Sequence, residues 1–210
     1  MTQLNDDNFL TIGNLSNNST CLIWFHGYGS NNWSFEPSMK LIHMLLDEKL
    51  FIIMPNAPIV DGKRSWYPLP VSHEKGITED YEGLRNSQKD ICCLLEKHIN
   101  KNNVFVGGFS QGAALSLSLL FSKLIDIKGC IALSGYMPNA NMYNNMDIQN
   151  AEIFMSHGYK DEAILFTSYT KSIEFIKSKT EKITTHTGDF GHTITKEVTD
   201  SLVNWLKDKI

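Results

Sequence analysis

The sequence lacks the features of a secreted, membrane-spanning or nucleic-acid-binding protein. No apolar run approaches the roughly 18 residues that a membrane-spanning helix needs. The N-terminus, Met1-Thr-Gln-Leu-Asn-Asp-Asp, is acidic where a signal peptide would be basic. The net charge is −4 and no basic cluster is present, which argues against a nucleic-acid partner. We therefore expect a cytoplasmic protein.

Cysteine is scarce and shows no pattern. The four cysteines, Cys21, Cys92, Cys93 and Cys130, have neither Cys-x-x-Cys spacing nor the arrangement of a disulfide-rich domain. Two lie in apolar strand-like runs and the adjacent pair lies in a predicted helix. We interpret them as small residues that fill the core, and they suggest no structural metal.

Apolar runs of two kinds account for most of the chain. At 210 residues, with 42% hydrophobic and 20% charged residues, the chain suits one domain over residues 1–210. Continuous apolar runs bounded by turn residues predict buried strands, as in a sheet that is covered on both faces. Such strands are expected at 21–25, 50–54, 103–107, 129–134 and 151–156, with an edge strand at 182–187 and helices at 37–48, 79–100, after residue 110, at 163–179 and at the C-terminus.

The segment 103–121 carries the strongest chemical signal. A short strand leads into Gly108-Phe109-Ser110-Gln111-Gly112, and an apolar helical segment follows. The order strand, tight turn, helix is the context that a Gly-x-Ser-x-Gly nucleophile turn requires, because glycine on both sides removes side chains that would collide where strand and helix meet. Ser110 is therefore the predicted nucleophile. An ordinary strand-to-helix turn is the alternative.

A second glycine-rich turn follows an early strand, at His26-Gly27-Tyr28-Gly29. In serine hydrolases such a turn supplies a backbone N–H to the developing oxyanion, and the residue after the nucleophile supplies another. The predicted oxyanion donors are the N–H groups of Tyr28 and Gln111. We interpret His26 as a residue that orients this loop.

The acid and the base are sought after the serine in the chain order Ser, Asp, His. Asp161 follows a late strand in His157-Gly-Tyr-Lys-Asp161, and His192 lies in a glycine-bracketed loop before the last helix. An imidazole in such a loop can take the serine proton if a carboxylate orients it. Asp147 and Asp189 are the alternative acids.

A long segment, residues 59–78, contains glycine, proline and aromatics without a sustained period. It is expected to be a loop, and its length fits a mobile lid. Ser65-Trp66-Tyr67-Pro68-Leu69 in this loop is expected to form an apolar wall over the serine, with Trp66 and Leu69 binding substrate. The alternative is that Trp66 and Tyr67 only cap the core.

The ordered set of motifs resembles the acyl-protein thioesterase and carboxylesterase branch of the α/β-hydrolases, which includes small lysophospholipases. The resemblance covers most of the chain from about Leu22. The motifs that carry it are His26-Gly-Tyr-Gly, Met54-Pro-Asn-Ala-Pro, Ser65-Trp-Tyr, Gly108-Phe-Ser-Gln-Gly, Leu133-Ser-Gly-Tyr-Met-Pro, His157-Gly-x-x-Asp161 and Gly191-His192.

The resemblance implies an α/β fold, with a mostly parallel central sheet and helices on both faces. It further implies a cofactor-free serine esterase acting on acyl esters or thioesters, an apolar acyl channel and frequent homodimers. By motif, Ser110, Asp161 and His192 match the catalytic triad, and Tyr28 and Gln111 match the oxyanion positions. Tyr28, Ser30 and Pro68 differ from the family's usual residues, so the resemblance identifies the reaction better than the substrate.

Several alternatives stay open. The leaving group could belong to a small ester, a lysolipid or a lipidated protein, and docking on membranes is not determined. A lactone hydrolase of the dienelactone type would use cysteine where this chain has Ser110. A non-catalytic binding protein of the same fold would be expected to lose triad residues, which this chain retains in order.

Overall fold

A seven-stranded sheet runs through the centre of the molecule. The computed structural model describes residues 9–15, 20–73, 76–98 and 103–210, so the acidic residues 1–7 lie outside it. The strand order is β1-β3-β2-β8-β9-β10-β11, with only the edge strand β1 antiparallel to its neighbour. The strands are β1 (Phe9–Ile12), β2 (Thr20–Phe25), β3 (Leu50–Pro55), β8 (Val104–Phe109), β9 (Gly129–Leu133), β10 (Glu152–Gly158) and β11 (Ile183–Gly188).

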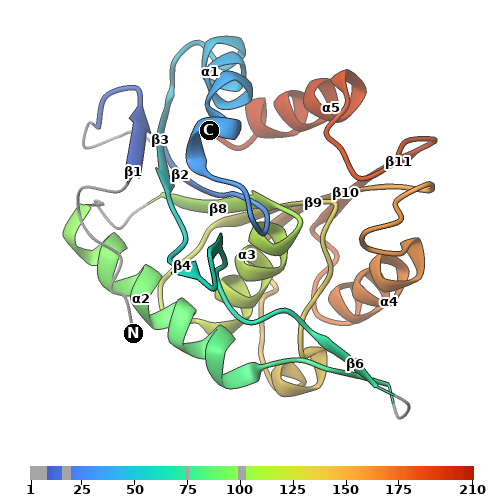
Figure 1. Ribbon diagram of the computed structural model, residues 1–210. Coiled ribbons are helices and arrows are strands. Elements are labelled where there is room, and N and C mark those ends of the chain that lie inside the picture. The colour runs from blue at the N-terminus through green and yellow to red at the C-terminus, as the bar shows by residue number, and fades with distance from the viewer. Residues whose placement is uncertain (1–8, 16–19, 74–75, 99–102) are drawn as a thin grey trace.

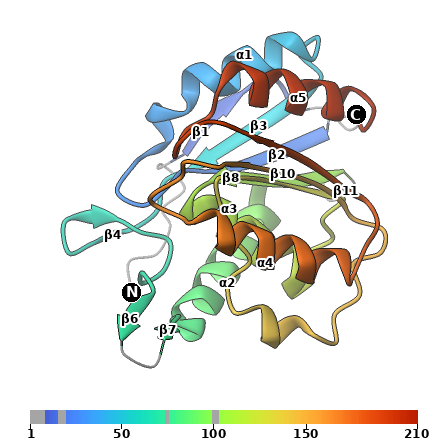
Figure 2. The same ribbon diagram turned by 90° about the vertical axis from the view of Figure 1, so that its right-hand side faces the viewer.

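Helices cover both faces of this sheet (Figure 1). α1 (Glu36–Leu45) and α5 (Lys196–Lys207) lie together on one face, whereas α2 (Tyr81–His98), α3 (Gln111–Ser122) and α4 (Phe166–Lys177) lie on the other. The turned view shows the same three layers (Figure 2). The 3-10 helices η1 (Asn32–Ser34) and η2 (Ala140–Tyr143) lie in connections. The predicted α/β class, sheet and helix arrangement are confirmed.

The segment 59–78 differs from the expected irregular loop. It contains two short antiparallel hairpins, β4 (Ile59–Val60) with β5 (Lys63–Arg64), and β6 (Val71–His73) with β7 (Gly76–Thr78). Both hairpins extend beyond the main layers in Figure 2. Strands of two or three residues are too short to show a side-chain period, which is why the sequence pattern indicated a loop.

The core has one part on each face of the sheet. Helix α3 is buried along Gln111–Phe121 because α2 and α4 enclose it against the strands. On the other face, Phe105 and Phe154 pack against Trp205 of α5, with ring centroids 6.1 and 5.7 Å apart. Cys21, Cys92 and Cys130 are buried as expected, but Cys93 is exposed because it falls on the solvent side of α2.

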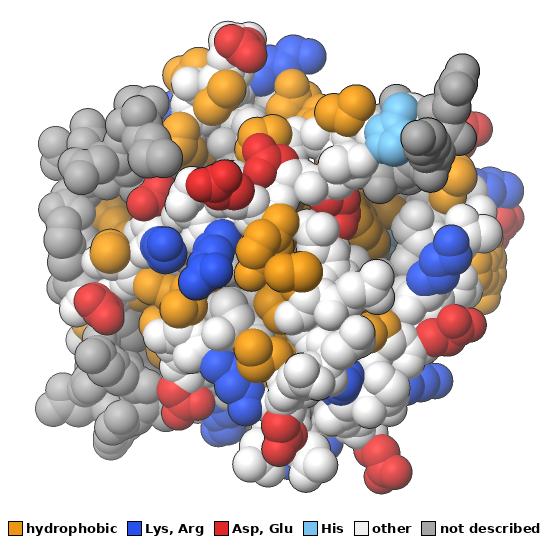
Figure 3. All heavy atoms as spheres, turned by 90° about the horizontal axis from the view of Figure 1, so that it is seen from below, with side chains coloured by type: hydrophobic (Ala, Val, Ile, Leu, Met, Phe, Trp, Pro, Cys, Tyr) orange, Lys and Arg blue, Asp and Glu red, His pale blue; other side chains and the backbone are white. Residues whose placement is uncertain are grey.

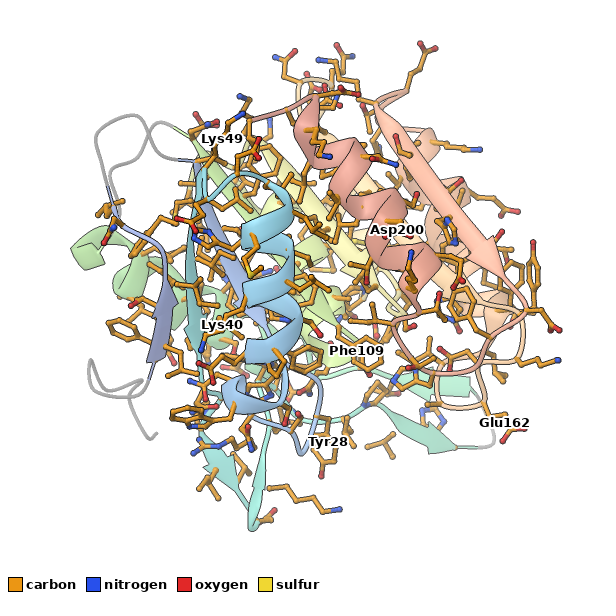
Figure 4. All side chains as sticks on the ribbon, turned by 90° about the horizontal axis from the view of Figure 1, so that it is seen from above. Tyr28, Lys40, Lys49, Phe109, Glu162 and Asp200 are labelled. Atoms are coloured by element: carbon orange, nitrogen blue, oxygen red, sulfur yellow. The ribbon has the colours of Figure 1, made fainter. Side chains whose placement is uncertain are left out.

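Parallel strands bring distant loops to one end of the sheet. Phe25 pairs with Gly108 across β2 and β8, and Gly158 pairs with Gly188 across β10 and β11. The loops that follow these strands therefore start side by side at the carboxyl edge, where α/β proteins bind ligands. Figure 4 shows Tyr28, Phe109 and Glu162 toward this end and Lys49 at the opposite end.

The surface shows no field of a single sign on the face drawn in Figure 3. Acidic and basic side chains are interspersed there, with hydrophobic side chains gathered near the centre. Within the described ranges, no helix is both long and apolar enough to cross a membrane.

The packing of β10 against α5 gives a test of the fold. Phe154 is fully buried, so Phe154→Ala should lower the free energy of unfolding by about 3–5 kcal/mol through lost burial and a residual cavity. Leu124→Ala, at a side chain 48% exposed, should change it by less than about 0.5 kcal/mol. Urea denaturation measures both, and equal losses would contradict this packing.

Candidate active site

The serine turn has the strained backbone that the motif predicts. Ser110 has φ 56° and ψ −118°, in a region that a non-glycine residue adopts only when its surroundings enforce it. A Cβ on Gly112 would lie 2.1 Å from the Phe25 carbonyl oxygen, and one on Gly108 would lie 2.5 Å from the Gly112 backbone. Both glycines are therefore required for β2, β8 and α3 to meet at Ser110.

The glycine-rich turn after β2 lies directly against the serine. A Cβ on Gly27 would approach Ser110 Cβ to 3.3 Å. Gly29 N–H donates to Arg64 O (2.8 Å), which fixes the far side of the turn and leaves Tyr28 between the two anchors. Gln111 begins α3, so its N–H lies in the first turn, where helical N–H groups have no intrahelical acceptor. The two predicted oxyanion donors therefore lie on backbone segments that adjoin Ser110.

Asp161 is a fully buried carboxylate with a partner on each oxygen. Its Oδ1 accepts hydrogen bonds from the N–H groups of Ala163 (3.0 Å) and Ile164 (2.8 Å), and its Oδ2 lies 2.7 Å from His192 Nδ1. The alternative Asp189 is exposed and pairs with Lys160 at 2.8 Å. The structure therefore brings Asp161, and not Asp189, to the imidazole.

His192 is held by this carboxylate and by an aromatic neighbour. Its Nδ1–H donates to Asp161, and its ring lies 4.7 Å, centroid to centroid, from Phe109, the residue before the serine. The side chain is 24% exposed, and His192 lines the same cavity as Ser110.

A cavity of about 620 Å³ opens over these groups. Its wall is mostly apolar, with Glu79 as its acidic residue, and Leu69 belongs to it as expected. The lining residues are Tyr28, Tyr67, Leu69, Pro70, Glu79, Ser110, Gln111, Tyr136, Ala163, Ile164, Leu165, Ser168 and His192.

Trp66 does not line this cavity, which corrects one of the two expectations for it. It is 4% exposed, its ring packs against Phe25 (5.2 Å) and His26 (5.0 Å), and its Nε1–H donates to His26 O (2.8 Å). The neighbouring Tyr67 reaches the cavity instead. The chain bends at Trp66 and Tyr67, and the two aromatic side chains have different surroundings, Trp66 the core and Tyr67 the cavity.

Two side chains, those of Gln111 and Tyr136, have roles at the site that the motifs did not predict. Gln111 was expected to contribute only its backbone, but its side chain accepts from Trp66 N–H (3.1 Å) and donates to Tyr67 O (2.7 Å). Tyr136, which follows β9, joins the wall of the cavity. No sequence pattern marked either of these two roles.

His26 orients its loop, as predicted. Nδ1–H donates to Gly27 O (2.8 Å) and Nε2 accepts from Ala57 N–H (3.0 Å). This arrangement uses the neutral ring, and burial accordingly lowers the pKa of His26 to about 4.

Comparison with known proteins identifies the family. A family model described as phospholipase/carboxylesterase matches residues 8–210. The chain belongs to the phospholipase/carboxylesterase family. The protein is therefore an enzyme of the hydrolase class, and the resemblance stated from its motifs is confirmed.

Individual relatives of the phospholipase/carboxylesterase family cover most of the chain. A probable carboxylesterase, SOBER1-like, of Arabidopsis thaliana is 29% identical over 210 residues, covering 91% of this chain and 79% of that protein. Acyl-protein thioesterase 1 homolog 1 of Dictyostelium discoideum is 30% identical over 179 residues, covering 79% of each. The crystal structure of acyl-protein thioesterase 2 of Zea mays has a TM-score of 0.83 at 20% identity, covering 96% of this chain and 98% of that one, and so shares the fold.

The serine turn predicts a steric effect that can be separated from backbone strain. Gly112→Ala should cost at least about 3 kcal/mol of stability, because its Cβ would overlap the Phe25 carbonyl. Gly62→Ala is the matched control: Gly62 has φ 77° but no atom within 4 Å, so only about 1–2 kcal/mol should be lost. Urea denaturation compares them, and an equal loss would refute the steric explanation.

The neutral His26 predicts a pH dependence of stability. Its folded pKa, about 4, lies below the ordinary value of 6.5, so its contribution is present above pH 6.5 and lost as pH falls toward 4. The loss between pH 7 and pH 4 should be about 3 kcal/mol. Urea denaturation of wild type and His26→Gln should give a shallower pH dependence for the variant, and identical slopes would exclude this assignment.

Proposed function

We propose that Ser110, His192 and Asp161 form a catalytic triad that cleaves acyl esters or thioesters through a covalent acyl-enzyme. The observation that carries this proposal is the buried Asp161–His192 hydrogen bond of 2.7 Å, in a cavity that also exposes the strained Ser110. A buried carboxylate oriented on the imidazole fixes the ring tautomer with its free nitrogen toward the serine.

The first step acylates the serine. His192 Nε2 takes the Ser110 hydroxyl proton while Oγ attacks the carbonyl carbon, and the carbonyl electrons move to oxygen. The N–H groups of Tyr28 and Gln111 stabilise that oxyanion. The tetrahedral intermediate collapses when the bond to the alcohol or thiol breaks, and His192 returns the proton to this leaving group.

In the second step, water attacks the acyl-enzyme and Ser110 is the leaving group. His192 removes a proton from water, the hydroxide attacks the acyl carbon, and collapse releases the acid and regenerates Ser110. Asp161 stays ionised in both steps and stabilises the imidazolium that forms. No metal or cofactor takes part in this proposal.

The apolar wall supports an acyl group as the bound part of the substrate. Leu69, Ile164 and Leu165 line the cavity, and about 0.8 kcal/mol is gained for each CH₂ that leaves water. Relatives are named as a carboxylesterase and an acyl-protein thioesterase, which supports an ester or thioester as the bond that is cleaved. A small ester, a lysolipid and a lipidated protein are the substrates compatible with this chemistry.

The nucleophile is tested by removing single groups. Ser110→Ala and Asp161→Asn should each lower kcat by on the order of 10⁴-fold with the fold retained, since the triad acts as a unit. Steady-state hydrolysis of p-nitrophenyl esters and of an acyl thioester measures this loss. A fluorophosphonate probe should add mass at Ser110 of the wild type, and folded wild-type protein without such labelling would favour a non-catalytic binding protein.

Placing a charged side chain in the apolar wall of the cavity tests whether that wall binds the acyl chain. Leu69→Asp should reduce kcat/KM for octanoyl esters about tenfold or more and have little effect on acetyl esters, because only the longer chain needs the apolar wall. Leu41→Asp is the matched control, with a leucine of similar exposure (47% against 45%) in α1 on the other face of the sheet. Equal losses for both chain lengths would place the acyl group elsewhere.

A further inference from the structure

A second imidazole lies beside the acid of the proposed triad. His157, near the end of β10, is fully buried, and its Nε2 lies 2.8 Å from Ile164 O and 3.4 Å from Asp161 Oδ2. Asp161 Oδ2 is the oxygen that receives the hydrogen bond from His192. One carboxylate oxygen therefore faces two histidine nitrogens.

The proton on His157 can be assigned from its partners. A carbonyl oxygen can only accept, so the nitrogen next to Ile164 O carries the hydrogen. Burial lowers the pKa of His157, and the hydrogen bonds to the Ile164 and Gly135 backbones and the nearby Asp161 oppose this shift. The Nε2–H donates to Ile164 O, and Asp161 Oδ2 lies 3.4 Å from the same nitrogen. The ring face stacks on Tyr169 of α4 with centroids 5.1 Å apart.

These contacts close a small ring around the acid loop. Ile164 donates its N–H to Asp161 Oδ1 (2.8 Å) and accepts from His157 at its carbonyl. Because Ala163 N–H also bonds Oδ1, that oxygen is fixed, and Oδ2 is left between the two imidazoles. A phenylalanine at position 157 would fill the same space without this N–H.

We propose that His157 is a positioning residue for the hydrolytic reaction. Its Nε2–H holds the Asp161–Ile164 turn closed, so that Oδ2 stays directed at His192 Nδ1. The inference rests on the proposed triad. His157 itself is not among the residues that line the cavity, so it would act only through Asp161. Loss of the N–H should lower kcat more than it changes KM, because it releases Asp161 Oδ2 from His192 but frees only Ile164 among the residues that line the cavity.

Two variants separate the N–H from the ring. His157→Phe keeps an aromatic ring against Tyr169 but removes the N–H donor. His157→Gln removes the ring but supplies an amide N–H at about the position of Nε2. We expect His157→Phe to lower kcat by about tenfold to a hundredfold, as misplacement of a catalytic group does, with KM within about twofold. His157→Gln should recover most of this loss.

A readout without substrate accompanies the kinetics. Proton NMR of the resting enzyme reports the far-downfield N–H that His192 shares with Asp161. This resonance should broaden or move in His157→Phe and be retained in His157→Gln. His43→Gln, which alters another buried histidine in α1 on the other face of the sheet, should leave kcat and the resonance unchanged.

The outcomes are distinguishable. A His157→Phe variant with wild-type kcat and an unchanged resonance, or a His157→Gln variant as impaired as Phe, would overturn the inference. Circular dichroism at the assay temperature checks that each variant is folded. If the wild type neither hydrolyses esters nor is labelled at Ser110, the proposed function fails, and the resonance still decides whether His157 positions Asp161.

Discussion

The close approach of three backbone segments at residues 25, 108 and 112 is the constraint on which the site depends. The Phe25 carbonyl lies where a Cβ on Gly112 would be, so β2, β8 and α3 can meet only because that position has no side chain. This contact holds Ser110 at positive φ, a conformation that costs about 1–3 kcal/mol and persists only when the surrounding packing over-determines it. The packing of the buried helix α3 on the sheet supplies the stabilisation that offsets this cost.

The polar groups around the serine are held in place by burial and by hydrogen bonds. Asp161, His157 and His26 are each almost fully enclosed and each has hydrogen-bond partners, as a buried polar group must to avoid a large desolvation cost. Burial lowers the pKa of both His26 and His157, which bind backbone groups, whereas the partly exposed His192 faces the cavity. The surroundings thus separate the two scaffold histidines from the one in the proposed reaction.

The cavity combines elements that are far apart in the chain. Leu69 comes from the segment between the two small hairpins, Tyr136 from the connection after β9, and Leu165 from the turn before α4. Loops generally vary more than the sheet that they connect, so under the proposed function these loops would set which acyl group fits, and the strand ends would hold the reacting groups.

The sequence by itself determined the order of strands and helices, the serine turn and the family, because these rest on local spacing: apolar runs, paired glycines, and Ser, Asp and His in a fixed order. It did not determine which aromatic of the 66–67 pair faces the cavity, that Cys93 is exposed, or that residues 59–78 form hairpins. Nor did it indicate that Gln111 bonds through its side chain or that His157 faces Asp161. Those facts depend on which surfaces meet once the parallel strands align, and contacts between residues distant in sequence leave no periodic trace in the chain.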